Sequence, residues 1–347
     1  IVTDPVILGH LYYYIVESVP SGASDPGSGK TQLYGFVKIR DPYALAGTEV
    51  YKVAQDLLVD AWDEDYPGEP NSDGYSPNGE YIGSTRTDIQ GGFYITYDTY
   101  DGWELSNRDP FLQFYTDILG VVAIYDNSSR VYLYRMYNDY SDLESGAYSI
   151  YIQGSTYYDS LSGKSLYRND ATSYDKVTLG SSVVYVLSGP VAELLVLSML
   201  ARNFSMYVLS EYSLSQLNIT YPASTGVYFY NATDSRLWAP AAVNYTEFFM
   251  AYSQFLLAQY DALPSFQTNY NLSVHTDQTT AWVVGWSVFL AEVMKRYYMG
   301  SENFDLRDLE SLYDTDHSGK DEDTAAGVAG VLWDLYDAVD DDQDGDG

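Results

Sequence analysis

Residues 80–100 read EYIGSTRTDIQGGFYITYDTY, and this stretch decides the expected fold of the first half of the chain. Apolar and polar residues alternate on both sides of a TDIQGG turn, which is typical of two neighbouring strands that bury one face. Similar patterns, punctuated by Gly, Pro and Asp, recur in residues 33–41, 48–65, 111–126 and 129–137. We therefore predict an antiparallel β-sandwich over residues 31–140.

Three segments of this region also carry a resemblance to a known family. VDAWDED, YIGSTRTDIQGGFYI and DGWELSNRDPFLQFYT resemble the transthyretin-like or prealbumin-like sandwich found in many secreted bacterial and archaeal proteins. The family's TD-x-x-G-x-F element falls on Thr87, Asp88, Gly91 or Gly92, and Phe93. The resemblance implies a fold and implies no chemistry, because one fold hosts many functions.

The composition limits the kind of protein and its partners. At 347 residues the chain is long enough for about two domains. It carries 49 acidic and 17 basic residues, a formal net charge of −32, which repels nucleic acid and anionic lipid surfaces. Such self-repulsion favours bound divalent cations, and we expect calcium. The chain has no cysteine, which excludes disulfides and thiolate metal sites.

From residue 183 the periodicity becomes helical. Helices are predicted over residues 183–209, 246–260, 281–298 and 324–338, with short strand-like runs at 217–223 and 226–231. Residues 141–180 are rich in Ser, Tyr and Gly and are interpreted as a connecting region. The second half is therefore expected to be α+β and mostly helical.

AWVVGWSVFLA and VAGVLWDLYD, within a region of residues 180–342, resemble a secreted zinc-metallopeptidase domain of the gluzincin type. In that family the motif H-E-x-x-H supplies two zinc ligands, and a glutamate on a later helix supplies the third. The resemblance places H-E-x-x-H on Thr246, Glu247 and Met250, and the third ligand on Val284. A hydroxyl, a thioether and a valine cannot hold catalytic zinc, so residues 181–338 are predicted to form an inactive, zinc-free pseudo-peptidase domain.

Glu247 has a second interpretation that needs no catalysis. Asn244 precedes it by three residues, the spacing of a capping box in which both side chains bond free backbone amides of a helix start. The chain's three histidines, His10, His275 and His317, are far apart and include no pair at a spacing of four. The sequence therefore predicts a helix cap at Glu247 and no enzyme.

Acidic loops provide candidate calcium ligands. DTDHSGKDED places Asp314, Asp316 and Ser318 at alternate positions before Gly319, although Ala325 stands where a calcium loop has its bidentate glutamate. The tail over residues 339–347 fits D-x-D-x-D-G, and the alternative is a disordered acidic tail. A third, weaker set lies in the loop of residues 63–80, where a solvated hairpin loop is the alternative. The tail candidates are Asp340, Asp342 and Asp344, and the weaker set is Asp63, Asp65 and Asp73.

Glycosylation signals and the start of the chain point to secretion. Six N-x-[ST] triplets occur, where chance would give roughly two. The chain starts at Ile1 without methionine or signal segment, as in a processed secreted protein, although a trimmed chain would look the same. No apolar run approaches 18 residues, so no membrane span is predicted. The candidate sites are Asn127, Asn203, Asn218, Asn231, Asn244 and Asn271.

The N-terminal 30 residues are unusual. Residues 1–20, IVTDPVILGHLYYYIVESVP, are apolar and β-prone, and SGASDPGSGK follows as a flexible spacer. The segment is either an edge strand of the next domain or a strand donated to a neighbouring copy. The chain also holds 38 tyrosines against 12 phenylalanines, which suits half-exposed contact surfaces or replaces phenylalanine in the core.

These features together favour a non-catalytic, extracellular, calcium-binding glycoprotein that polymerises with copies of itself into a filament or surface layer. An adhesin-like module that binds a ligand in the inactive peptidase cleft is the alternative. An active metallopeptidase with unrecognised ligands is a third possibility, which the lost zinc ligands disfavour.

Overall fold

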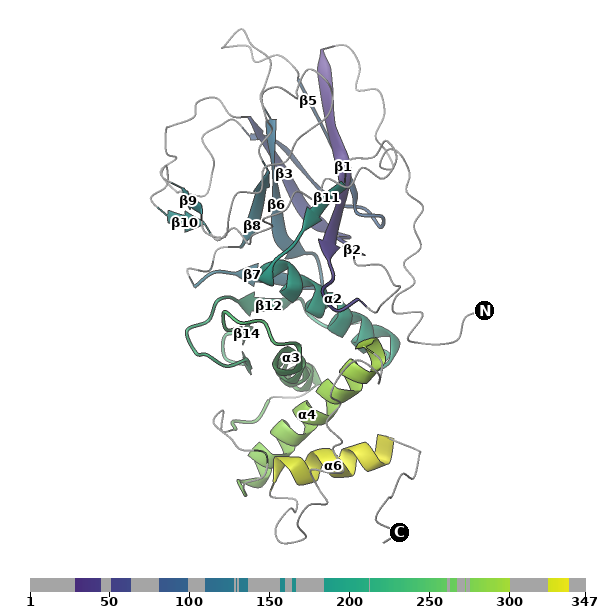
Figure 1. The fold of residues 1–347 in the computed structure, drawn as a ribbon, viewed down its shortest axis with the longest axis vertical. Helices are drawn as coiled ribbons and strands as arrows, with labels where there is room; N and C mark the ends of the chain where they lie inside the picture. The colour runs from purple at the N-terminus through teal and green to yellow at the C-terminus, as the bar shows by residue number, and fades with distance from the viewer. Residues whose placement is uncertain are drawn as a thin grey trace, which may run out of the picture. The chain divides into compact units, whose positions relative to one another are not determined.

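The chain is a multi-domain α+β protein with mixed sheets and helices (Figure 1). It divides into two compact units. The sheet unit comprises the described residues within His10–Met199 and Gln216–Tyr221, and the helical unit those within Leu200–Ser215 and Pro222–Gly347. The computed structural model describes residues 29–44, 51–63, 81–98, 110–127, 129, 131–136, 157–159, 164–166, 184–211, 213–260, 263–266, 272, 275–299 and 324–336.

The first sheet of the sheet unit is built on the long strand β1 (Lys30–Arg40). β5 (Gly92–Asp98) and β2 (Tyr51–Val53) pair with it in antiparallel orientation. β11 (Val184–Leu187) pairs with it in parallel orientation. Strands from distant parts of the sequence thus meet on β1.

The second sheet is larger. Its described order within this unit is β12-β7-β6-β3-β4, with β8 also paired to β6. All of these pairs are antiparallel except β12 with β7, and a separate pair forms between β9 (Tyr157–Asp159) and β10 (Lys164–Leu166). The strands are β3 (Leu57–Asp63), β4 (Tyr81–Arg86), β6 (Pro110–Ile118), β7 (Val122–Tyr125), β8 (Leu133–Met136) and β12 (Leu217–Thr220).

Alternating apolar side chains form the core of this unit. In β3, residues 57, 59, 61 and 63 are buried while the residues between them are half-buried, as the period of two requires. Phe93 of the first sheet meets Phe114 of the second edge to face, with ring centroids 5.8 Å apart. The two sheets are therefore in contact through aromatic side chains that the alternation turns inward.

The five predicted strand stretches of the first half are confirmed as strands. Two findings differ from the expectation. Val184–Leu187 was expected to be helical and is the strand β11, because a run as short as VYVL has no period that separates the two structures. The sheets are also not purely antiparallel, since β11 and β12 are both parallel to their partners. Residues beyond the expected boundary at 181 thus belong to the sheet unit.

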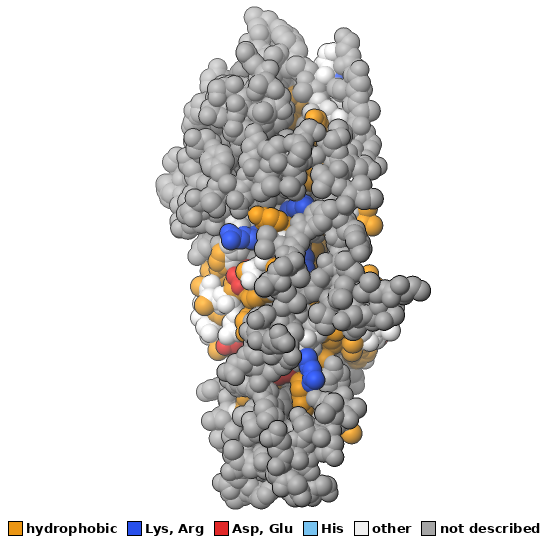
Figure 2. All heavy atoms as spheres, turned by 45° about the vertical axis from the view of Figure 1, so that its right-hand side comes forward, with side chains coloured by type: hydrophobic (Ala, Val, Ile, Leu, Met, Phe, Trp, Pro, Cys, Tyr) orange, Lys and Arg blue, Asp and Glu red, His pale blue; other side chains and the backbone are white. Residues whose placement is uncertain are grey.

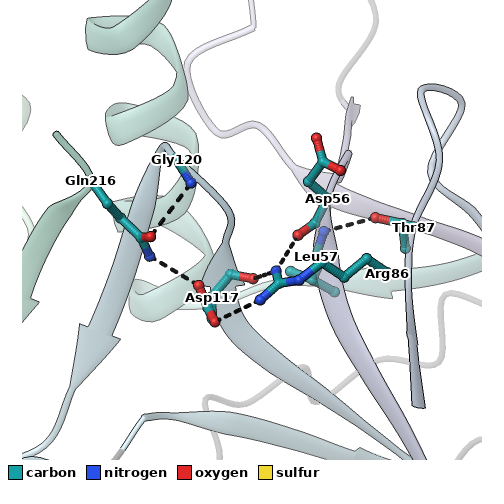
Figure 3. Close-up of polar contacts among 7 residues, drawn as sticks. All are labelled: Asp56, Leu57, Arg86, Thr87, Asp117, Gly120 and Gln216. Carbon is teal, nitrogen blue, oxygen red and sulfur yellow. Dashed lines mark hydrogen bonds and ion pairs between the residues drawn. The ribbon is translucent and has the colours of Figure 1, made fainter. Parts of the chain in front are cut away.

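A polar network fastens β12 to the second sheet (Figure 3). The Arg86 guanidinium donates to the backbone oxygens of Asp56 and Asp117, at 2.6 and 3.1 Å, and to the Asp117 carboxylate at 3.0 Å. The other Asp117 carboxylate oxygen accepts from the Gln216 amide at 2.9 Å. Gln216 directly precedes β12, so these contacts hold the strand's start in register with β7.

The helical unit contains α3 (Tyr245–Tyr260), α4 (Gln278–Met299) and α6 (Ala325–Tyr336), together with the hairpin of β13 (Phe229–Asn231) and β14 (Arg236–Trp238). α3 packs on α4, and α4 packs on α6. α2 (Pro190–Tyr207) contributes residues to both units. The helices predicted at 246–260, 281–298 and 324–338 are confirmed to within three residues at each end.

Side-chain caps explain where these helices begin. Asp277 accepts from the Thr280 amide at 2.9 Å and from the Thr280 hydroxyl at 2.7 Å before α4. These hydrogen bonds lower the pKa of the Asp277 carboxyl below its usual value. Thr324 accepts from the Gly327 amide at 3.1 Å before α6. Each cap satisfies an amide that has no partner inside the helix.

Several tyrosines serve as core residues. The Tyr132 hydroxyl donates to the Tyr221 carbonyl at 2.6 Å, and the Tyr134 hydroxyl donates to the Ser188 carbonyl at 3.0 Å. Their rings are less than a tenth exposed, so they pack as phenylalanine would while the hydroxyl satisfies a backbone oxygen. This supports the interpretation that tyrosine replaces phenylalanine in the core.

Other large hydrophobic side chains remain exposed, and Figure 2 shows hydrophobic groups at the surface beside scattered lysine and arginine side chains. In the described part of the chain, no helix combines the length and apolarity that crossing a bilayer requires. The exposed side chains are Tyr81, Ile89, Tyr94, Leu119, Tyr207, Val208, Val227, Tyr260, Trp282, Val331 and Leu335.

Candidate functional site

The four positions that the peptidase resemblance assigned to zinc chemistry lie on two helices that pack together. Thr246, Glu247 and Met250 are in the first two turns of α3, and Val284 is in α4. Thr246 and Met250 share a helix face and are half-buried, Glu247 is exposed, and Val284 is fully buried at 0% exposure. The Val284 side chain fills the helical core and has no atom that can bind a metal.

Glu247 belongs to the start of α3, as predicted, but only half of the expected capping box is present. The Asn244 side-chain oxygen accepts from the Glu247 amide at 3.2 Å, which is the cap. The Asn244 amide donates to the Tyr228 hydroxyl at 3.2 Å, so the reciprocal bond to the Glu247 carboxylate is replaced. Tyr228 lies directly before β13, sixteen residues earlier in the chain, and its hydroxyl takes the place at this backbone amide that the exposed glutamate would have in a capping box.

Substitutions at this helix start separate the two roles. Asn244→Ala is expected to lower the free energy of unfolding of the helical unit by about 1 kcal/mol, because the Glu247 amide loses its partner. Glu247→Gln is expected to change it by less than about 0.5 kcal/mol, because its carboxylate is exposed. Urea unfolding followed by circular dichroism measures both.

The control for this experiment is Thr246→Ala, which removes the same N-x-[ST] triplet as Asn244→Ala but leaves the capping oxygen in place. A loss for Thr246→Ala equal to that for Asn244→Ala would show that the cap is not the cause. A loss for Glu247→Gln larger than that for Asn244→Ala would mean that the carboxylate has a role that the cap does not explain.

A buried ion pair lies in α4. Both carboxylate oxygens of Glu292 are 2.7 Å from the Lys295 ammonium, and the two side chains are 3% and 4% exposed. The ammonium also lies 5.9 Å from the centre of the Tyr245 ring at the start of α3. Two opposite charges with full hydrogen-bonded contact neutralise each other, so the helical unit holds no net charge at this point.

Other buried polar groups of the helical unit bond to the protein itself. The Gln254 side-chain oxygen accepts from the Tyr230 amide at 3.0 Å, and the Tyr252 and Ser205 hydroxyls lie 3.1 Å apart. Burial raises the pKa of Tyr252 to about 12, so its hydroxyl stays protonated at neutral pH. The Trp286 indole nitrogen is buried without a hydrogen-bond partner. The polar groups of Gln254, Tyr252 and Ser205 are therefore satisfied within the helical unit, whereas the Trp286 indole nitrogen is an unsatisfied donor.

Gly285 explains how the two segments that carry the peptidase resemblance fit together. It lies in α4 within AWVVGWSVFLA, and a side-chain carbon there would be 2.6 Å from Cβ of Val328 and 2.7 Å from the Ala325 carbonyl oxygen. Both of those residues belong to α6. Glycine thus permits the close approach of α6, since no larger residue leaves room for the partner helix.

The candidate calcium ligands are mostly beyond what the structure describes. Asp63 ends β3 and is buried at 2% exposure, which differs from the solvated loop position expected for it. Among the described residues, no three acidic or histidine side chains come together where they could hold a metal ion. Outside the described residues lie Asp65, Asp73, Asp314, Asp316, Ser318, Asp340, Asp342 and Asp344.

The N-x-[ST] triplets fall into two structural groups. Asn127 and Asn244 are exposed, and Asn231 is half-buried in β13 with its threonine exposed. Asn203 lies inside α2 and Asn218 inside β12, and the hydroxyl residues of their triplets, at 205 and 220, are buried at 0% and 2%. The triplets of the first group have exposed residues at which a glycan has space. Those of the second group lie within a helix or a strand and have a buried hydroxyl residue. Asn271 lies outside the described residues.

Sequence reasoning missed several buried or half-buried charged groups in the sheet unit. Asp41 and Lys52 form an ion pair at 3.3 Å, and the Tyr43 hydroxyl donates to the Glu193 carboxylate. Burial lowers the pKa of Lys38 to about 8 and raises that of Glu193. Nothing in the alternating pattern of residues 33–41 distinguishes a buried lysine from a solvated one, so no local signal was present.

Comparisons with known proteins add little to this geometry. No protein-family model matches the chain, and no curated protein matches it. Among solved structures, a 9R-lipoxygenase from Cyanothece PCC8801 aligns with 35% of this chain at 15% identity, with a TM-score of 0.20. The chain spans 16% of that protein's length. A TM-score this low carries no argument about fold or activity.

Proposed function

We propose that this chain is a non-catalytic, extracellular structural glycoprotein that assembles with copies of itself into a filament or surface layer and is stabilised by calcium. In this proposal the sheet unit is a transthyretin-like β-sandwich, and the helical unit is a peptidase scaffold that has lost its zinc ligands. The observation that carries it is the environment of Val284. At the position that the peptidase resemblance assigns to the third zinc ligand stands a fully buried aliphatic side chain, and the positions assigned to the two histidines, in the first two turns of α3, carry a hydroxyl and a thioether.

Two further observations support a structural role. The Glu247 amide is bonded to a cap and its carboxylate is exposed, which suits a helix start rather than a base aimed at a substrate. Glu292, the acidic residue of α4, has both carboxylate oxygens hydrogen-bonded to the Lys295 ammonium. These polar groups of α3 and α4 thus stabilise the fold. A scaffold of this kind is suited to a structural role.

The chain's large negative charge is the reason that calcium is part of the proposal. A net charge of −32 repels itself and other copies of the chain, and assembly multiplies this repulsion. Hard divalent cations bound by carboxylate oxygens would remove it, and the acidic loops at 314–318 and 340–344 have the spacing for that role.

Electron microscopy of the full chain tests the proposal. In negative stain, ordered assemblies are expected in millimolar calcium and fewer or none after addition of a calcium chelator. Magnesium at the same concentration is the control for general charge screening. Dispersed monomers under all conditions would refute self-assembly, and assemblies indifferent to the chelator would remove calcium from the proposal. One equivalent of zinc per chain in elemental analysis would contradict the inactive scaffold.

A further inference from the structure

Within the part of the chain that the structure describes, strand β1 is paired along only part of one of its two edges. β5 pairs with β1 from Lys30 to Phe36, and β11 pairs with it only from Phe36 to Ile39. Phe36 pairs with both strands, so they must lie on opposite sides of β1. In Figure 1, β11 accordingly accompanies only part of the length of β1. On the β11 side, residues 30–35 have no strand partner among the described residues.

The backbone directions identify which groups face this flank. The Val37 amide donates to the Gly91 carbonyl at 2.7 Å, on the β5 side. Amides and carbonyls alternate in direction along a strand that pairs on both sides, so those of Leu33 and Gly35 also face β5. Those of Gln32 and Tyr34 face the other way, and both residues are half-buried. A row of unpaired donors and acceptors is a template for an added strand.

We propose that this flank receives residues 1–20 of a second copy as an added strand, continuing the line of β11. The proposal rests on the proposed self-assembly and names the contact that produces it. The flank of six residues is about 20 Å long, which a short strand covers. Residues 1–20 are rich in Ile, Val, Leu and Tyr, the residue types that strands prefer.

The length of chain before β1 favours this occupant. Residues 21–29, SGASDPGSG, separate the segment from β1 and span at most about 30 Å when extended, which reaches a neighbouring copy. The residues directly before β11, TLGSSV at 178–183, are smaller and more polar and have weaker strand preference. If residues 1–20 paired with β1 of the same copy, they would occupy this flank. No strand from a neighbouring copy could then bind there, so pairing within one copy is incompatible with the proposed self-assembly.

A matched pair of full-chain variants tests the flank. Gln32→Pro and Gln32→Ala both lose the hydrogen bond from the Gln32 side chain to Thr96. Only proline also removes the amide that faces the flank, while the amides that face β5 stay intact. We expect Gln32→Pro to raise the concentration needed for assembly by about tenfold or more and Gln32→Ala to leave it within about twofold. Sedimentation measures this, and circular dichroism checks that both variants are folded.

Cysteine pairs identify the donor, because the chain has no cysteine of its own. Tyr34→Cys is mixed with Tyr12→Cys, Tyr13→Cys or Tyr14→Cys, which together cover both strand faces and neighbouring registers. Covalent dimers on a non-reducing gel in at least one mixture are expected. Ser84→Cys, at an exposed position of β4, replaces Tyr34→Cys as the control. Double variants that close only an internal disulfide, with no dimers in the mixtures, would show that the segment pairs with its own copy and would overturn the proposal.

The outcomes separate this inference from the proposed function. If the wild-type chain assembles and both Gln32 variants assemble equally well, the flank is not the acceptor while the structural function stands. If the wild-type chain never assembles, the proposed function fails and this inference fails with it.

Discussion

Replacing Glu292 by leucine is expected to lower the free energy of unfolding by about 3–5 kcal/mol, one of the largest effects of any single substitution in the helical unit. The variant leaves the Lys295 ammonium at 4% exposure with neither of its two carboxylate contacts. An isolated buried ammonium cannot recover the hydration that it lost on folding. The face of the Tyr245 ring, 5.9 Å away, offsets only a small part of this cost.

The double variant Glu292→Leu with Lys295→Met provides the control. It replaces both charged groups by apolar side chains of similar volume, so its free energy of unfolding is expected to lie within about 1 kcal/mol of the wild-type value. Urea unfolding followed by circular dichroism gives both numbers, and their difference isolates the cost of the unpaired charge. A single variant as stable as the wild type, or a double variant as unstable as the single, would contradict a buried, mutually satisfied pair.

The strands and helices themselves could be predicted from local pattern. The alternation at residues 57–63 identifies β3, and the apolar period of 3.6 identifies α3, α4 and α6. Asn244 before α3 predicted the start of that helix. A capping side chain bonds a backbone amide only three residues further on, so the spacing can be read from the sequence. Whatever depends on near neighbours in the chain was therefore accessible.

What depends on distant neighbours was not. Strand β11 pairs with β1, which lies about 150 residues earlier in the chain. The parallel orientation depends on the path by which the chain returns to the sheet, and the residues VYVL do not encode it. The partner of the Asn244 amide, Tyr228, comes from a loop whose path the sequence does not specify. At the candidate site, sequence placed Thr246 and Val284 on helices correctly, but only the packing of α3 on α4 shows that Val284 is entirely within the core.

The TDIQGG turn combines both kinds of information. The Asp88 carboxylate accepts from the amides of Gln90 and Gly92, each at 2.8 Å, which is a local turn that Asp commonly makes. Gly91 between them has φ of +78°, and its carbonyl accepts from the Val37 amide of β1 at 2.7 Å. The turn after Thr87 thus contacts β1 of the first sheet. The TDIQGG motif, which the sequence shows directly, therefore lies at a long-range contact of the fold.

Gly91→Ala is accordingly expected to lower the free energy of unfolding by about 3 kcal/mol or more. Positive φ alone costs an L-residue about 1–2 kcal/mol. In addition, the new methyl group would lie 2.5 Å from the Val37 carbonyl oxygen, and neither backbone can move without disturbing the pairing of β1. The two costs add because the same methyl group makes two separate unfavourable contacts, one with its own backbone and one with the Val37 carbonyl oxygen.

Gly120→Ala separates the two contributions. Gly120 has φ of +71°, and an added carbon there meets nothing within 4 Å, so only the cost of positive φ applies, about 1–2 kcal/mol. Thermal and urea unfolding of the two variants against wild type is expected to show Gly91→Ala as the more unstable by about 1–3 kcal/mol, the range for a forced steric contact. Equal losses would mean that the turn gives way without strain, and the close approach of Gly91 to Val37 would then not constrain how β5 meets β1.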